Sequence, residues 1–578
     1  MITRAEHPTE RHRRLTQRML PMGALAFVAF VCGAVIGAGH VTGEQQVAER
    51  FASAWRHGDY AGMQATLTAK QRRTISATTL AQAYAIARAT ATVSSYDIGR
   101  PRRVGDGAFL LPVTAHTTSF GDVTGTVRLP IAGHGNQARI RWAINETFPG
   151  VPAGVRLARQ TTLPPRATLL ARDNTVLAHG PDRSSPLGSI ASSVVGDLGP
   201  IPVEQAAAFR RAGYPDDAQV GVSGLERIFE RRLAGTPGGR LTAGGRVLAS
   251  RAPHRASPVR TTISPVVQQA AVTALAGRLG GVVAMKPRTG EILAAAGIAF
   301  SGLQPPGSTF KMVTVTGVLQ NRLATPGSTF PYATAATLSG VTLGNANGES
   351  CGGTLLQAFA VSCNSVFAPL GARLGAHRLV AVAERFGFNR PSPIPGVATS
   401  AIPPATEIGD DLAVGSSAIG QGRVLATTLQ MTDVAATIGL GGRLPVPTLA
   451  YRSGQPERLG ARVTTAKVAR EVRRMMVDVV RRGTGFRAAI PGVTVAGKTG
   501  TAELRTTQPC TPNTRAPESC VNQTTNTPST TDTDAWFVSF APARAPKIAV
   551  GVLLVEDGAG GDTAAPAARI VLEEALRH

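Results

Sequence analysis

The sequence predicts a multidomain α+β protein with a transmembrane helix at its N-terminus, and three observations predict it. A chain of 578 residues with 43% hydrophobic content is long enough to form several domains with separate cores. An apolar run near the N-terminus is about 20 residues long, enough to cross a bilayer as a helix. The remaining chain combines segments of helical hydrophobic spacing with segments of alternating, strand-like spacing.

The apolar run extends from Leu20 to Val41 and contains no Asp, Glu, Lys or Arg. Arginines precede it, which predicts that residues 1–19 form a cytoplasmic tail and residues 20–41 a single-pass signal anchor in the cell membrane. The rest of the chain then lies on the extracytoplasmic side. A cleaved signal peptide is the alternative, but its apolar region is usually shorter. Ala29-Phe30-Val31 ahead of Cys32 lacks the small residues of a lipoprotein cleavage site.

The net charge of +24 does not predict a nucleic-acid partner. Only six of the 60 basic residues are lysines, a skew typical of GC-rich coding sequences. The arginines are scattered singly, and no basic strip interleaved with aromatic residues occurs. A basic domain beside an anionic cell envelope is physically reasonable.

Four of the five cysteines lie in the part of the chain that is expected outside the membrane, where disulfides persist. Local pairing would join Cys351 to Cys363 and Cys510 to Cys520. The sequence leaves this pairing open, and Cys363 can equally be a buried free thiol. No zinc-ligand spacing occurs, so we expect neither a metal site nor another cofactor.

Two regions show their secondary structure in their hydrophobic spacing. Residues 44–147 predict a small α+β domain, with a helix around Val47, Phe51 and Trp55. Strands follow at residues 109–116, 125–131 and 138–144. From about Val259 we expect a helix over residues 265–279, capped by Ser264, and then a hairpin of strands at residues 281–285 and 291–296.

Three short motifs carry the chemistry, and they occur in one order along the chain. They are Ser308-Thr309-Phe310-Lys311, Ser362-Cys363-Asn364 and Lys498-Thr499-Gly500-Thr501. Each alone is weak, because such spacings arise by chance in long proteins, and a capped helix, a polar turn or a strand end would explain it. All three in this order are a strong signal for a serine acyl-transferase.

The first motif has the spacing of a nucleophile and its base. Pro and Gly directly before Ser308 are typical of a helix start, and positions i and i+3 share one helix face. The Lys311 amine would therefore lie beside the Ser308 hydroxyl, which needs a base to become a nucleophile. Lysine acts as a base when burial or a second cation lowers its pKa, and Lys498 can supply that cation.

The motif set is that of penicillin-binding proteins and serine β-lactamases, and this chain resembles the class B penicillin-binding proteins. The resemblance implies that Ser362 relays a proton between the lysines and the leaving amine. It also implies that Asn364 hydrogen-bonds the substrate backbone, and that the backbone N–H groups of Ser308 and Thr501 form the oxyanion hole.

In the third motif, the resemblance implies that Lys498 and the hydroxyls of Thr499 and Thr501 bind the terminal carboxylate of the substrate. Gly500 would let the substrate approach the backbone closely. The motif is expected at the end of an edge strand, and Ala535–Phe540 resembles the neighbouring strand. Gly420-Gln421-Gly422 resembles an architectural element near the active-site loop of the family.

Further segments resemble the family's domain arrangement. Pro164–Asn174 and Gly224-Leu225-Glu226-Arg227 resemble motifs of its pedestal, or dimerisation, domain, which is expected at residues 155–258. The penicillin-binding, β-lactamase-like transpeptidase domain, an antiparallel sheet flanked by helices, is expected at residues 259–578. Residues 44–147 resemble the nuclear transport factor 2-like domain of some members, which would act as a spacer.

The resemblance implies a membrane-anchored D,D-transpeptidase that cross-links peptidoglycan stem peptides ending in D-Ala-D-Ala through an acyl-enzyme on Ser308. β-Lactam antibiotics would acylate the same serine. No glycosyltransferase signature occurs, so a separate glycosyltransferase is an expected partner. A D,D-carboxypeptidase or β-lactamase is one alternative, although no E-x-x-L-N element is present. A non-catalytic penicillin-binding sensor or scaffold is another, against which the intact motif residues argue.

Overall fold

The computed structural model describes residues 42–105, 107–454, 456–503 and 533–578. The predicted anchor at residues 20–41, Cys32, and the predicted pair Cys510 and Cys520 lie outside this part. Within the described ranges, no helix combines the length and the apolar character needed to cross a membrane.

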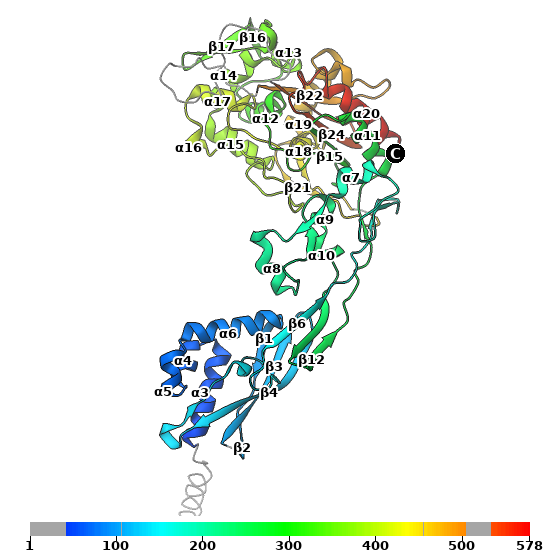
Figure 1. Ribbon diagram of the computed structural model, residues 1–578. Helices are drawn as coiled ribbons and strands as arrows, with labels where there is room; N and C mark the ends of the chain where they lie inside the picture. The colour runs from blue at the N-terminus through cyan, green and yellow to red at the C-terminus, as the bar shows by residue number, and fades with distance from the viewer. Residues whose placement is uncertain (1–41, 106, 455, 504–532) are drawn as a thin grey trace, which may run out of the picture. The chain divides into compact units, whose positions relative to one another are not determined.

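The helices and strands that Figure 1 shows belong to two compact units. We call them the N-terminal unit and the C-terminal unit. The N-terminal unit contains the chain up to Leu163 together with Ala206–Pro215 and Pro237–Pro253. The C-terminal unit contains Pro164–Gln205, Asp216–Thr236 and His254–His578. The segment that was expected as one pedestal, residues 155–258, therefore contributes to both units.

Four helices of the N-terminal unit begin at residues whose side chains cap them. The helices are α3 (Gly43–His57), α4 (Tyr60–Ala65), α5 (Ala69–Thr74) and α6 (Ala77–Thr90). The side chains of Thr42, Asp59, Thr68 and Ser76 each accept a hydrogen bond from a backbone N–H of the first turn. The predicted helix around Val47, Phe51 and Trp55 is confirmed, and it buries these three residues.

The same unit contains an antiparallel sheet in the order β1-β3-β4-β5, with β2 paired to β3. The strands are β1 (Val93–Ile98), β2 (Arg102–Val104), β3 (Ala108–Thr117), β4 (Gly121–Ala132) and β5 (Arg139–Ile140). The predicted strands at residues 109–116 and 125–131 are confirmed. The strand predicted over residues 138–144 is too long, since β5 covers only Arg139–Ile140. The side-chain amide of Gln71 hydrogen-bonds both the N–H and the carbonyl of Trp142, so these backbone groups are not available for pairing with a neighbouring strand.

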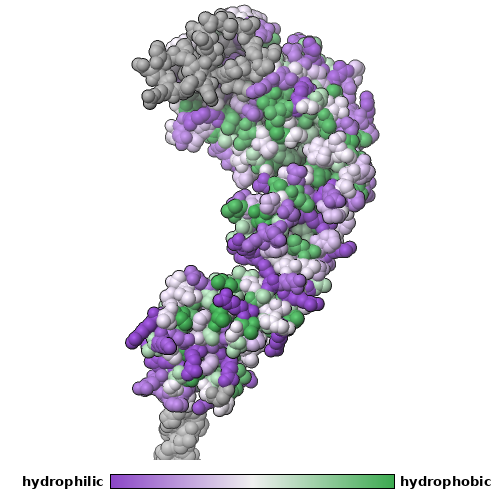
Figure 2. All heavy atoms as spheres, in the orientation of Figure 1, coloured by the Kyte–Doolittle hydropathy of each residue, from purple (hydrophilic) through white to green (hydrophobic). Residues whose placement is uncertain are grey.

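A three-stranded sheet in the order β12-β11-β6 belongs to the N-terminal unit as well. It is formed by β6 (Leu157–Thr162), β11 (Gly238–Ala243) and β12 (Arg246–Arg251). On the face of this unit that Figure 2 shows, hydrophilic and hydrophobic side chains are interspersed.

The C-terminal unit is built on an antiparallel sheet in the order β15-β14-β24-β23-β22. Its strands are β14 (Gly280–Met285), β15 (Ile292–Gly297), β22 (Ala496–Glu503), β23 (Thr533–Ala541) and β24 (Ile548–Leu554). Val282 packs on one face with α11 (Pro265–Leu275) and α20 (Ala564–Arg577). Val283 packs on the other with α18 (Thr428–Gly439) and α19 (Ala466–Arg482). The predicted antiparallel sheet flanked by helices is confirmed.

Details of the helix that precedes this sheet differ from the prediction. Pro265 opens α11 as expected, but the helix ends at Leu275 because Ala276 adopts a left-handed conformation. The predicted side-chain cap is wrong, since Ser264 makes no such bond. Its backbone N–H donates instead to the Leu293 carbonyl at 2.8 Å, which ties the helix start to β15.

The two pedestal-like segments meet in a buried ion-pair cluster of the C-terminal unit. Arg166 lies 2.6 Å from Glu226 and 2.9 Å from Glu230, and Arg183 lies 2.6 Å from the other oxygen of Glu226. Glu226 is fully buried, so its carboxylate depends on these arginines. The contacts support an architectural role for both segments.

Candidate active site

The predicted nucleophile lies in a short helical turn that leads directly into a longer helix. Ser308 belongs to the short 3-10 helix η5 (Gly307–Phe310), which continues into α12 (Lys311–Gln320). The N–H of Gly307 donates to the Gly420 carbonyl at 2.9 Å. A Cβ on Gly420 would lie 2.0 Å from the Gly307 carbonyl oxygen, so only glycine fits there. The Gly420-Gln421-Gly422 segment thus supports the turn that carries Ser308.

The third motif lies in the middle of β22, the last strand in the sheet order. Its position on an edge strand is confirmed, and so is its pairing with the strand that contains Ala535. Its predicted position at the strand end is wrong, because β22 begins at Ala496, only two residues before the motif, and extends to Glu503. A Cβ on Gly500 would lie 2.8 Å from the Pro306 carbonyl oxygen, so this glycine lets the Ser308 turn approach the strand.

The fold brings the first two motifs together around one amine. Lys311 Nζ lies 2.9 Å from Ser308 Oγ, 3.3 Å from Ser362 Oγ and 2.6 Å from the Ser362 carbonyl oxygen. It also lies 2.6 Å from Asn364 Oδ1. These residues come from η5, α12, the S-x-N turn and the first residue of α14 (Asn364–Leu374).

A second amine reaches the same serine hydroxyl from β22. Lys498 Nζ donates to Ser362 Oγ at 2.8 Å and to the Thr499 carbonyl at 3.0 Å. The Ser362 hydroxyl therefore lies between two lysines, a position from which it can pass a proton. Ser362 has a φ of 64°, a left-handed conformation that is strained for a residue with a Cβ and is typical of functional sites.

Burial lowers the pKa of both lysines, and charge repulsion adds to the effect at Lys311. Both side chains are fully buried. Desolvation holds the pKa of Lys311 well below its usual value, and the nearby charge of Lys498 lowers it further. Desolvation alone lowers the pKa of Lys498 to about 7. A neutral amine at Lys311 is therefore accessible at physiological pH.

The contacts of Lys311 indicate where its lone pair points when the amine is neutral. The two shortest contacts are to the Ser362 carbonyl and Asn364 Oδ1, which can only accept hydrogen bonds. A neutral amine has two hydrogens, and these two acceptors use both. The lone pair is then left for the hydroxyl hydrogen of Ser308, which is the geometry of a general base.

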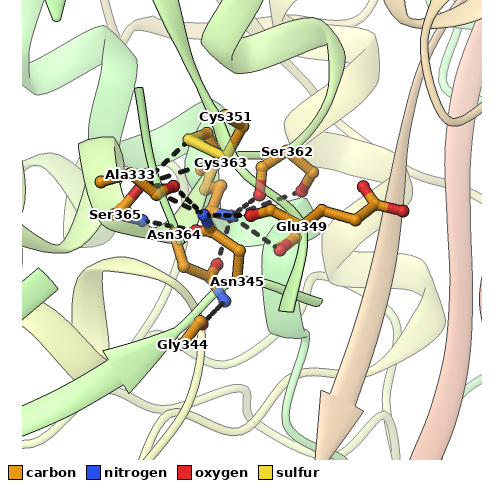
Figure 3. The surroundings of a disulfide bond; sticks show 11 residues. Ala333, Gly344, Asn345, Glu349, Cys351, Ser362, Cys363, Asn364 and Ser365 are labelled. Atoms are coloured by element: carbon orange, nitrogen blue, oxygen red, sulfur yellow. Dashed lines mark hydrogen bonds between the residues drawn. A yellow bond between two sulfur atoms is a disulfide. The ribbon is translucent and has the colours of Figure 1, made fainter. Parts of the chain in front are cut away.

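The S-x-N turn is braced by a disulfide (Figure 3). Cys363 is joined to Cys351 at the start of β19 (Cys351–Thr354), which is the local pairing considered from the sequence. Cys363 is buried, so a free thiol was a reasonable alternative on burial alone. The turn that carries Ser362 and Asn364 is thus covalently linked to the segment before it.

Two residues outside the motifs contact the third motif. Thr484 Oγ1 lies 2.5 Å from Thr499 Oγ1, and the N–H of Gly560 donates to Thr501 Oγ1 at 3.4 Å. A Cβ on Gly560 would lie 2.2 Å from the Gly500 carbonyl oxygen. The sequence signal for Gly560 is the glycine-rich run after β24, whereas Thr484 carries no motif.

The described residues contain no group of three or more His, Cys, Asp or Glu side chains placed to hold a metal ion.

Two protein-family models match the chain. Residues 280–573 match the penicillin-binding protein transpeptidase domain, and residues 174–251 match the penicillin-binding protein dimerisation domain. All three motifs lie within the first of these ranges.

Relatives and solved structures agree with the family models. The chain is 34% identical over 414 residues to peptidoglycan D,D-transpeptidase PbpA of Mycobacterium tuberculosis, which covers 61% of this chain and 76% of the relative. It is 36% identical over 415 residues to PbpA of Mycolicibacterium smegmatis, with 61% and 77% covered. The imipenem acyl-enzyme complex of penicillin-binding protein A from M. tuberculosis superposes with a TM-score of 0.55 at 28% identity, covering 71% of this chain and 98% of that chain.

Proposed function

The chain belongs to the class B penicillin-binding proteins, which join a dimerisation domain to a transpeptidase domain, and we propose that it cross-links peptidoglycan as a D,D-transpeptidase. The observation that carries this proposal is the 2.9 Å contact of Ser308 Oγ with the buried amine of Lys311. A nucleophile and a base with lowered pKa are the minimum that acyl transfer requires.

In the first half-reaction, Ser308 Oγ attacks the carbonyl between the last two D-Ala residues of a donor stem peptide. Its proton passes to Lys311, and the new C–O bond forms as the carbonyl becomes an oxyanion. The backbone N–H groups of Ser308 and Thr501 stabilise that charge, and losing one such donor typically costs about 3 kcal/mol. The C–N bond then breaks, and the leaving D-Ala amine takes a proton through Ser362.

In the second half-reaction, an amine of a neighbouring stem peptide attacks the acyl-enzyme ester. The proton that this amine loses returns through the same groups to Ser308 Oγ, which leaves as the new amide bond forms. Ser362 Oγ suits the relay because both lysines contact it. Lys498, Thr499 and Thr501 bind the terminal carboxylate of the donor, and Asn364 binds its backbone.

A β-lactam antibiotic has an amide carbonyl in a strained ring, and it acylates Ser308 in the same way. The relative from M. tuberculosis has been solved as acyl-enzyme complexes with imipenem and with penicillin G. Ring opening keeps the leaving nitrogen attached, so the ester persists.

The N-terminal region gives the proposed enzyme its location. We assign residues 20–41 as a membrane anchor and place the catalytic site on the extracytoplasmic side, where a disulfide such as Cys351–Cys363 persists. The helices and sheet of residues 44–147 would be a nuclear transport factor 2-like spacer. A separate glycosyltransferase would supply the glycan strands.

The decisive experiment follows a fluorescent penicillin on purified protein of residues 42–578, alongside the Ser308→Ala variant. A transpeptidase gives a label that is stable over hours and absent in the variant. A label that forms and clears within minutes would instead identify a hydrolase. If the unmodified protein takes up no label, the result would favour a non-catalytic scaffold.

A further inference from the structure

Asn345 lies beside the S-x-N turn, although it belongs to none of the motifs (Figure 3). It follows the hairpin of β17 (Ala335–Leu338) and β18 (Val341–Gly344). Its amide nitrogen donates to the carbonyls of Ala333 and Glu349, each at 2.8 Å. Its amide oxygen accepts from the N–H of Ser365 at 2.8 Å. The half-buried side chain therefore ties together three backbone segments.

The peptide unit between Gly344 and Asn345 is held on both sides. The N–H of Asn345 donates to the Thr334 carbonyl at 2.8 Å. The carbonyl of Gly344, in the same planar unit, accepts from Asn364 Nδ2 at 2.9 Å. Rotation of this unit would break both bonds.

The contacts determine the orientation of the Asn364 amide. Its Oδ1 lies 2.6 Å from Lys311 Nζ, which has hydrogens to donate, and its Nδ2 faces a carbonyl oxygen that can only accept. Exchange of the two amide ends would set oxygen against oxygen. One hydrogen of Nδ2 is used by Gly344, and the second remains for a ligand.

We propose that Asn345 is a positioning residue, which holds the Gly344 carbonyl in place and thereby aims the second N–H of Asn364 at the backbone carbonyl of the bound substrate. This inference rests on the proposed function, since it concerns substrate binding at that site. Asn345 itself touches neither the substrate nor the reacting atoms, because its amide is occupied by protein backbone.

The proposal distinguishes two classes of β-lactam. Benzylpenicillin carries an acylamino side chain whose carbonyl can accept the Asn364 N–H, as a peptide carbonyl does. Imipenem carries a hydroxyethyl group in that place and has no such carbonyl. Loss of aim at Asn364 should therefore slow acylation by benzylpenicillin more than acylation by imipenem.

The test measures second-order acylation rate constants of both antibiotics on protein of residues 42–578, as the unmodified chain and as Asn345→Ala and Asn345→Asp. Loss of one well-placed hydrogen bond predicts that the rate ratio of benzylpenicillin to imipenem falls about tenfold. In the Asn345→Asp variant, the rate ratio should fall by at least the same factor, because the new carboxylate would face two carbonyl oxygens. Rates are normalised to the folded fraction, which is measured by thermal unfolding.

Asn347→Gly is the matched control. This residue lies in the same loop, is exposed, and has a φ of 53° that glycine adopts freely. The control should keep the rate ratio of the unmodified protein. In an Asn364→Ala background, adding Asn345→Ala should lower the rate ratio no further, because the side-chain N–H that Asn345 positions is already absent.

An equal loss with both antibiotics would overturn the proposal, since Asn345 would then support the cleft as a whole. An unchanged ratio in both Asn345 variants would overturn it as well. Failure of the unmodified protein to be acylated would overturn the proposed function together with this inference, and the Ser308→Ala comparison separates that outcome from the other two.

Discussion

The C-terminal unit buries two lysines at its catalytic motifs, whereas the N-terminal unit buries one carboxyl group in an aromatic core. Lys311 and Lys498 are fully buried, and each amine has hydrogen-bond partners at 2.6 to 3.3 Å. Glu146 is 2% exposed, and its Oε2 is buried without a hydrogen-bond partner among the described residues.

The surroundings of Glu146 are apolar and aromatic. The rings of Trp55 and Tyr84 lie 4.9 Å apart, and Trp142 Nε1 donates to the Tyr84 hydroxyl at 3.3 Å. That hydroxyl donates to the backbone carbonyl of Glu146 at 3.3 Å rather than to its carboxyl group. Desolvation raises the pKa of Glu146 well above its usual value.

The difference teaches that burial alone shifts a pKa but does not make a catalytic group. In both units desolvation disfavours the charged form. Only the C-terminal unit places a nucleophile and a proton relay within hydrogen-bond distance of the shifted group. A perturbed pKa therefore indicates a site only together with such partners.

The largest expected effect concerns the base itself. Replacing Lys311 by methionine should lower the rate constant of acylation by penicillin by about 10²- to 10⁴-fold, because Ser308 keeps its hydroxyl but loses its proton acceptor. Thermal unfolding should show little loss of stability, since methionine fills a similar buried volume. Acylation at the unmodified rate would show that Lys311 is not the base.

A smaller effect should appear in the pH dependence of acylation. Lys311 must be neutral to accept a proton, and the charge of Lys498 favours the neutral form. Lys498→Met removes that charge, so the pKa of Lys311 rises and the acidic limb of the acylation profile should move to higher pH. The measurement is the rate constant between pH 5 and pH 9. An unmoved limb would mean that the two amines do not interact.

The smallest effect is expected in the N-terminal unit and should leave acylation unchanged. Because the pKa of Glu146 is raised on folding, its stability contribution is fully present below the unfolded pKa and is lost as pH rises toward the folded value. Glu146→Gln should therefore raise stability at pH 8 by about 1 to 3 kcal/mol and change it little near pH 4. Thermal unfolding at both values checks this. A lower melting temperature at pH 8 would contradict it.

Hydrophobic spacing predicted those helices and strands whose bounds depend on neighbouring residues in the sequence. The helix around Phe51, the long strands of the N-terminal sheet and the hairpin of β14 and β15 follow from hydrophobic spacing. Errors arose where a distant side chain or backbone group intervened. Gln71 ends the strand expected over residues 138–144, and the Leu293 carbonyl takes the N–H of Ser264. Such long-range partners leave no periodic signal.

The same distinction applies to the candidate site. The motif residues were predicted from their types and order, and the structure brings Ser308, Lys311 and Ser362 into contact. Thr484, Gly560 and Asn345 were not predicted, because their contacts with Thr499, Thr501 and Ser365 span 15 to 59 positions along the chain and leave no local pattern in the sequence. Gly500 was predicted to admit substrate, and its closest neighbour is the Pro306 carbonyl of the nucleophile turn.

The disulfide between Cys351 and Cys363 has a consequence for how this sequence can change. The proposed mechanism assigns no role to the side chain at the middle position of the S-x-N motif. Here a change of Cys363 alone would leave Cys351 as a buried lone thiol, open to mispairing during oxidation. Substitutions at the two positions should therefore occur together among descendants of this chain, which couples a motif position to the first residue of β19, twelve residues earlier.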